Sequence, residues 1–143
     1  MRRSLLPTEA QEQVALFQLV ALHEKQYPAL RWLYHTPNGG LRNVVVARKL
    51  KALGTKPGIP DLFLPLPLGP FSGLWVELKS ARGTLSTAQR DWLTYLQSVG
   101  YAVAVCRSAD QALAVLTGYL NGRAFVGSRL VQFDPQRKRQ EAA

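Results

Sequence analysis

The chain has 143 residues and a mass of 15.9 kDa, which is the size of a single domain. Its hydrophobic content of 47% is normal for a globular fold and excludes wholesale disorder. No apolar run approaches the roughly 18 residues that cross a bilayer, and the start, MRRSLLPTEA, lacks the apolar stretch of a signal peptide. The single cysteine, Cys106, excludes an internal disulfide and a thiolate zinc cluster. We therefore expect a cytoplasmic protein with no membrane partner.

The charge balance is strongly basic. The chain has 18 Lys and Arg residues against nine Asp and Glu, for a formal net charge of +9. A surplus of this size in a small domain indicates a polyanionic partner, and nucleic acid is favoured over a membrane surface. Nucleic-acid packaging proteins share this composition, so charge alone does not separate an enzyme from a binding module.

Apolar periodicity, capping residues and breakers predict eight elements before residue 121. In chain order they are a helix over 8–26, a strand over 31–35, a basic helix over 44–53, a strand over 61–64, a strand over 74–79, a helix from the Ser86 cap to about 99, a strand over 101–106 and a helix from the Ser108 cap through 120. The basic helix begins behind Asn43 as its N-cap and ends at Gly54.

Two expectations about packing accompany these elements. Thr8 and Gln11 form a capping box at the start of the first helix. The buried stripe expected for that helix is Ala10, Val14, Phe17 and Ala21. The residues expected in the core elsewhere include Trp32, Trp75, Trp92 and Cys106.

The order of elements predicts the fold class. With the basic helix set aside as an insertion, a helix precedes three strands, and a helix, a strand and a last helix follow. This αβββαβ order predicts an α/β fold with a central mixed β-sheet flanked by helices. The strand over 101–106 is apolar on both faces, so we expect it to be central in the sheet. Residues 1–120 are assigned to one domain and 121–143 to a C-terminal arm and basic tail, in which 123–133 are compatible with a strand or an arm.

Charged residues at two neighbouring strands predict a chemical site. Asp61 follows Gly-Ile-Pro at a strand entrance, and Glu77-Leu78-Lys79 ends the next strand. Side chains alternate along a strand, so Glu77 and Lys79 point the same way, about 7 Å apart. If the two strands pair, two carboxylates and an ammonium group converge. Two such carboxylates repel each other without a cation between them, and hard oxygen ligands suit Mg²⁺ or Mn²⁺. A lysine beside such a cation can hold the attacking water and offset phosphate charge, which predicts phosphodiester hydrolysis.

Each fragment also has an ordinary interpretation. A Glu-x-Lys triplet is typical of an exposed strand with alternating charges, and Pro-Asp is typical of a turn. Glu9 and Glu12 lie in a first helical turn, where acids favour the helix dipole. The conjunction favours a site, because one strand, one turn and one strand separate Asp61 from Glu77 within an otherwise basic chain.

The combination of a helix glutamate, Pro-Asp and Glu-x-Lys resembles the PD-(D/E)XK nuclease signature. The surrounding sequence resembles the virus-type replication-repair nuclease (VRR-NUC) family over about residues 8–120. The resembling segments are TEAQEQVALFQLV from Thr8, HTPNGG from His35, GTKPGIPDLFL from Gly54, GLWVELKS from Gly73, GTLSTAQRDW from Gly83 and GYAVAVC from Gly100. The resemblance implies a restriction-endonuclease-like core and, if the protein is viral, residence in the host cytoplasm.

The resemblance also implies roles for individual residues. Asp61, Glu77 and the backbone carbonyl of Leu78 would bind the metal, and Lys79 would position the nucleophilic water. Gln89 matches a family glutamine thought to orient that lysine, although with Ser86 it also forms a capping box.

Two glutamates are candidates for the helix acid, and a larger group of residues is expected to contact DNA. Glu9 best matches the family's helix acid, with Glu12 in reserve. The residues expected to contact DNA are His35, Asn38, Arg48, Lys49, Lys51, Lys56 and Arg82. The three cations of the basic helix would contact phosphates, or else form a solvated face.

These observations predict a Mg²⁺-dependent, structure-specific DNA endonuclease. The resemblance implies products with 5′-phosphate and 3′-hydroxyl ends, and a homodimer that resolves four-way (Holliday) junctions, since a symmetric junction needs two paired cuts. Two alternatives stay open: a flap-cutting or nicking nuclease of phage replication and repair, and a basic DNA-binding module without catalysis.

Overall fold

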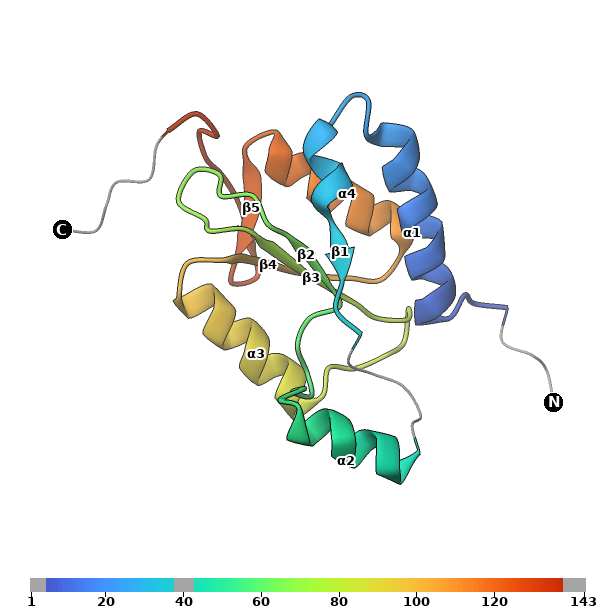
Figure 1. Ribbon diagram of the computed structural model, residues 1–143. Coiled ribbons are helices and arrows are strands. Elements are labelled where there is room, and N and C mark those ends of the chain that lie inside the picture. The colour runs from blue at the N-terminus through green and yellow to red at the C-terminus, as the bar shows by residue number, and fades with distance from the viewer. Residues whose placement is uncertain (1–4, 38–42, 138–143) are drawn as a thin grey trace.

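The computed structural model describes residues 5–37 and 43–137 (Figure 1). Its elements in chain order are α1 (Glu9–His23), the 3-10 helix η1 (Pro28–Trp32), β1 (Tyr34–His35), α2 (Val44–Ala52), β2 (Leu62–Leu64), β3 (Leu74–Leu78), α3 (Thr87–Ser98), β4 (Ala102–Cys106), α4 (Ala109–Leu120), β5 (Arg123–Val126) and β6 (Arg129–Gln132). None of the helices in these ranges is long and apolar enough to span a membrane.

The predicted mixed sheet is confirmed. Four strands lie in the order β1-β2-β3-β4, with antiparallel pairing from β1 to β3 and parallel pairing between β3 and β4. Helices α1 and α4 cover one face and α3 covers the other (Figure 1). The fold class read from the sequence, an α/β sheet flanked by helices with an inserted basic helix, is therefore correct.

Alternation along the strands separates a large core from a smaller one. Leu62 and Leu64 of β2 face α1 and α4, where they are fully buried. Phe63 points to the α3 side of the sheet, where its ring stacks on that of Trp75 at a centroid distance of 4.2 Å. The residues of odd number at this end of β2 and β3 therefore share the face that α3 covers.

The predicted face of the first helix is wrong for three of its four residues, and only Phe17 packs against the core. Leu16 and Val20 are buried, whereas Val14 is 62% exposed and Ala10 and Ala21 are also exposed. The segment from Val14 to Val20 carries apolar side chains on nearly every side of the helix, so its periodicity does not single out one face. The predicted capping box of Thr8 and Gln11 is confirmed.

Three further expectations are corrected. Residues 31–35 are not one strand, because η1 begins at Pro28 and runs through Trp32, which is 62% exposed rather than in the core. Strand β4 is the last strand of the sheet rather than a central one. Its residues are apolar on both faces because α3 covers one face and α4 the other. Cys106 is buried as expected, and its burial raises the pKa of the thiol to about 12.

Residues 123–133 were compatible with a strand or an arm. They form strands, because the segment after α4 folds into the hairpin β5–β6. Gly127 in the connecting turn has a φ of +65°, which favours glycine. Ala124 is buried in the main core, and the Phe133 ring packs against Phe71 and Tyr119. Residues 138–143, most of the predicted basic tail, lie outside the described residues.

Candidate metal and nuclease site

The two acids singled out in the sequence meet at one end of the sheet. The register of β2 with β3 pairs Leu62 with Val76, and extending it by one residue puts Asp61 opposite Glu77. Residues directly opposite in an antiparallel pair have Cβ atoms roughly 5 Å apart and share a face. The Asp61 carboxylate also accepts a hydrogen bond of 2.8 Å from the backbone N–H of Leu78. The strand, turn and strand between these acids therefore bring them together.

The surroundings of the pair raise the pKa values of both carboxyl groups. Glu77 is 2% exposed, and burial, with the nearby charge of Asp61, raises the pKa of its carboxyl to about 8. Burial also raises the pKa of Asp61, although the hydrogen bond from Leu78 opposes that shift. In the described part of the chain, Oε2 of Glu77 is buried without a hydrogen-bond partner. A buried carboxylate oxygen with no donor is suited to a cation.

The donor set fits a divalent cation that keeps most of its water. The site offers two carboxylates, and no group of three or more His, Cys, Asp and Glu side chains suited to a metal occurs in residues 5–37 and 43–137. Mg²⁺ is commonly held by one or two carboxylates together with water and phosphate oxygens, so two acids suffice. The backbone of Leu78 contacts the Asp61 carboxylate through its N–H, and its carbonyl stays a predicted ligand.

Lys79 and Glu9 meet beside the carboxylate pair. The distance from Lys79 Nζ to Glu9 Oε1 is 3.8 Å, with the lysine side chain only 11% exposed. The same Glu9 oxygen accepts a hydrogen bond of 3.3 Å from the backbone N–H of Ser80. The backbone of Lys79 continues the parallel ladder, because its N–H donates to the carbonyl of Cys106 at 2.9 Å. Lysine and carboxylates therefore share one end of the sheet.

The structure separates the two candidate helix acids. Glu9 reaches Lys79, whereas Oε2 of Glu12 accepts a hydrogen bond of 2.7 Å from the backbone N–H of Ala109, at the start of α4. Glu12 thus satisfies one of the free amides of a helix N-terminus. Both acids lie in the first turn of α1, and only their tertiary partners distinguish them.

Gln89 combines the two interpretations given for it. Its Oε1 accepts from the N–H of Ser86 while its own backbone N–H donates to Ser86 Oγ, which completes the predicted capping box. Its Nε2 donates a hydrogen bond of 2.9 Å to Oε1 of Glu77. One side chain therefore closes the N-terminus of α3 and orients a carboxylate of the site.

His35 supports the backbone at Asp61. Its Nδ1–H donates to the carbonyl of Asp61 at 2.9 Å, and the N–H of Thr36 donates to the same oxygen at 2.8 Å. His35 thereby anchors the strand entrance, a contact that the sequence did not predict for it. Asn38, expected to contact DNA, lies outside the described residues.

The remaining cations expected at the DNA are exposed and lie outside the carboxylate cluster. Three are on α2, which has no buried residue. Across residues 5–37 and 43–137, the only ion pair is that of Lys79 with Glu9, so none of these cations is paired with an acid there. They are Arg48, Lys49, Lys51, Lys56 and Arg82.

Two residues of this region make contacts that the sequence did not predict. Gly58 has a φ of +86°, and a Cβ there would lie 2.5 Å from the backbone carbon of Ala88, so only glycine lets this loop pack on α3. The guanidinium of Arg107 donates to the carbonyls of Ser80 and Gly83. Arg107 follows β4 directly, and parallel pairing of β3 with β4 is the signal that would have placed it beside Lys79.

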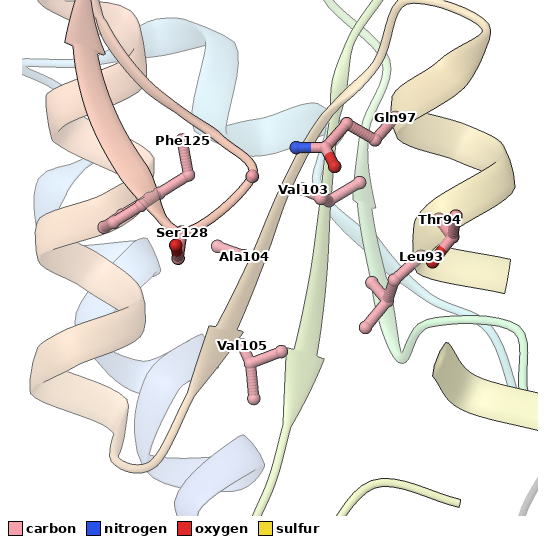
Figure 2. A pocket seen from close by; sticks show the side chains of 9 residues that line it. Leu93, Thr94, Gln97, Val103, Ala104, Val105, Phe125 and Ser128 are labelled. Atoms are coloured by element: carbon pink, nitrogen blue, oxygen red, sulfur yellow. The ribbon is translucent and has the colours of Figure 1, made fainter. Parts of the chain in front are cut away.

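A groove begins next to the carboxylate pair, because its lining residue Val105 is the partner of Glu77 in the β3–β4 register (Figure 2). It has a volume of about 360 Å³ and lies between α3, β4 and the β5–β6 hairpin, lined by apolar side chains such as Leu93, Val103 and Phe125. None of the candidate site residues that the structure describes lines it.

The sheet, its flanking helices and the acids at one sheet end define a restriction-endonuclease-like domain. The VRR-NUC domain model matches residues 7–110, and the chain belongs to this nuclease-type family, which generally uses divalent metal and acts on DNA. A solved structure described as a "VRR_NUC domain protein" is similar, with a TM-score of 0.67 and 25% identity over 81% of this chain and 90% of that chain. No curated protein matches the chain.

Proposed function

We propose that the chain is a structure-specific DNA endonuclease that depends on Mg²⁺ or Mn²⁺ and hydrolyses phosphodiester bonds. The observation that supports this most directly is the opposed pair Asp61 and Glu77, with Lys79 alongside and a buried oxygen on Glu77 that has no partner within residues 5–37 and 43–137. Membership of the nuclease-type family agrees with this chemistry.

The protein's own groups have distinct tasks in the proposed reaction. Asp61 and Glu77 would hold a divalent cation. When bound, it would offset the negative charge of the scissile phosphate and lower the pKa of a bound water molecule. Gln89 keeps Glu77 oriented, and Glu9 keeps the ammonium group of Lys79 near the water that attacks phosphorus. The P–O3′ bond breaks as the new P–O bond forms, which leaves 5′-phosphate and 3′-hydroxyl ends and releases one proton to solvent.

Charge along the chain supports a DNA substrate recognised by shape. No acidic residue occurs between Glu24 and Asp61, whereas this stretch contains the cations of α2 and Lys56. Contacts of lysine and arginine with phosphates position DNA without reading its bases. We propose that the preferred substrate is a branched DNA, and specifically a four-way junction cut by a C₂ homodimer, because a symmetric junction needs two paired cuts.

Two other functions remain as outcomes of the test. A flap-cutting or nicking nuclease of phage replication and repair would use the same site on a different DNA. A basic module without catalysis would bind DNA regardless of metal and would keep that binding when Asp61 is removed.

The test uses labelled four-way junction, flap and duplex DNA, with Mg²⁺, Mn²⁺ or EDTA, beside an Asp61→Ala variant. Paired symmetric cuts in the junction, abolished by EDTA and by D61A, are expected. Cleavage of flaps alone would keep the site and replace the junction, whereas binding without cutting under every metal would leave the binding module. A monomeric mass in light scattering at micromolar concentration would contradict the homodimer.

A further inference from the structure

The turn that follows Lys79 is held from both sides. On one side the backbone N–H of Ser80 donates to Glu9 of α1. On the other side, Nη1 of Arg107 donates to the carbonyl of Ser80 at 3.0 Å and also to the carbonyl of Gly83. The turn is itself compact, because a Cβ on Gly83 would lie 2.9 Å from Ser80 Oγ. The Ser80 peptide groups are thus fastened between a helix carboxylate and a guanidinium.

Arg107 is placed for this contact by the sheet. The parallel register pairs Leu78 with Cys106, and its next pair is Lys79 with Arg107. The backbone N–H of Arg107 donates to Oε1 of Gln111 at 2.6 Å, which fastens it to the first turn of α4. A guanidinium starting from this position reaches two carbonyls of the neighbouring strand's turn.

The contacts form a closed circuit around Lys79. From α1, Glu9 binds the turn at Ser80, Arg107 joins that turn to the start of α4, and the N–H of Ala109 returns to α1 through Glu12. The turn cannot move relative to α1 unless one of these bonds breaks. Arg107 supplies two of the bonds, so it is the member whose loss releases the turn most.

We propose that Arg107 is a positioning residue for Lys79, which acts through the 80–83 turn and does not serve mainly as a phosphate ligand. The proposal rests on the proposed nuclease function and adds to it a residue that sets the rate of the chemical step. A lysine at this position carries a compact ammonium group on a flexible stem and replaces the guanidinium only in part.

The experiment compares Arg107→Ala and Arg107→Lys with Arg123→Ala, an exposed arginine on β5 that takes no part in the circuit. Amide hydrogen exchange of Ser80 and Gly83 is measured by NMR in the free protein. Cleavage under single-turnover conditions is measured separately from the Kd for the same DNA in EDTA, over a series of salt concentrations. The exchange measurement does not depend on the protein being active.

The expected result for R107A is exchange at Ser80 and Gly83 at least about tenfold faster and a cleavage rate lowered by roughly 10²-fold, the scale of a small misplacement of a reacting group. The Kd and its salt dependence should stay close to wild type, R107K should recover part of the rate, and R123A should match wild type. If R107A does not fold, R107K provides the same comparison.

Two results would overturn the proposal. Unchanged exchange at the turn in both Arg107 variants would show that the residue does not hold it. A weaker Kd with a salt slope reduced by about one, at an unchanged rate on saturating DNA, would identify a phosphate contact. A third result would separate the two proposals. If exchange rises in R107A but wild type cuts no DNA, Arg107 does hold the 80–83 turn, and only the proposed nuclease function is wrong.

Discussion

The carboxylate end of the sheet and helix α2 differ in how firmly the rest of the chain holds them. Glu77 is 2% exposed and bound by Gln89, and Asp61 is held through the backbone of Leu78. Helix α2 has nine residues and no buried side chain, and its Val44 and Val45 are 65% and 71% exposed. Helices this short are marginal without packing. The protein holds its two acids by burial and hydrogen bonds, whereas its most basic helix has little packing to support it.

The largest expected effect on cleavage comes from the carboxylate end of the sheet. Asp61→Ala removes one of the two carboxylates, and Asp61→Asn keeps the shape without the charge. Because a metal ion contributes several kcal/mol to the transition state, we expect both to lower the cleavage rate by about 10³-fold or more. Single-turnover cleavage in Mg²⁺ measures this. Asp91→Ala, at an exposed position of α3, is the matched control, and cleavage by D61A close to that of D91A would contradict the site.

The same region should make the stability of the metal-free protein depend on pH. Between about pH 4.5 and pH 8, folded Glu77 keeps a proton that the unfolded chain has lost, so the free energy of unfolding falls as the pH rises. The loss should reach up to a few kcal/mol, and Glu77→Gln should flatten it. Urea unfolding in EDTA at several pH values measures it. Mg²⁺ should stabilise wild type more at pH 8 than at pH 5, and a flat profile for wild type would contradict the buried pair.

Helix α2 should show the opposite behaviour. Replacing Arg48, Lys49 and Lys51 together by alanine should weaken the Kd for DNA by about 10- to 10²-fold at low salt and reduce the salt slope by up to about three. The midpoint of thermal unfolding should hardly change, because the helix buries no side chain. The cleavage rate on saturating DNA should fall far less than in D61A. A Kd and salt slope equal to wild type would assign these cations to a solvated face.

The smallest effect separates the two roles of Gln89. Ser86→Ala removes only the helix cap, which costs about 1 kcal/mol of stability. Gln89→Ala removes the cap partner and also the hydrogen bond to Glu77, so it should lower stability by a similar amount and lower the cleavage rate by a further factor of about ten. Thermal unfolding and single-turnover rates measured on both variants provide the test. Equal rates would leave Gln89 with capping alone.

The sequence predicted what depends on local rules. The capping boxes of Thr8 and Ser86 follow from residues three positions apart, and a strand, turn and strand are enough to bring Asp61 opposite Glu77. The roles proposed for these side chains await the experiments above.

What escaped prediction depends on packing between distant segments. Glu9 and Glu12 lie in one helical turn, and only the positions of Lys79 and Ala109 tell them apart. The apolar pattern of β4 indicates that helices cover both of its faces. The same pattern does not reveal whether the strand has one neighbour in the sheet or two. Arg107 stands out only once β3 and β4 are known to be parallel.

The hairpin after α4 has a consequence for the outer edge of the sheet. Strand β4 is hydrogen-bonded to β3 on one side, and on its other side β5 packs beside it without joining the ladder. Open strand edges invite pairing with other chains, and a covering segment prevents this. The β5–β6 hairpin therefore covers this edge and hinders strand pairing between β4 and a second chain. A chain truncated at residue 120 should expose that edge and aggregate, even though every proposed catalytic side chain would still be present.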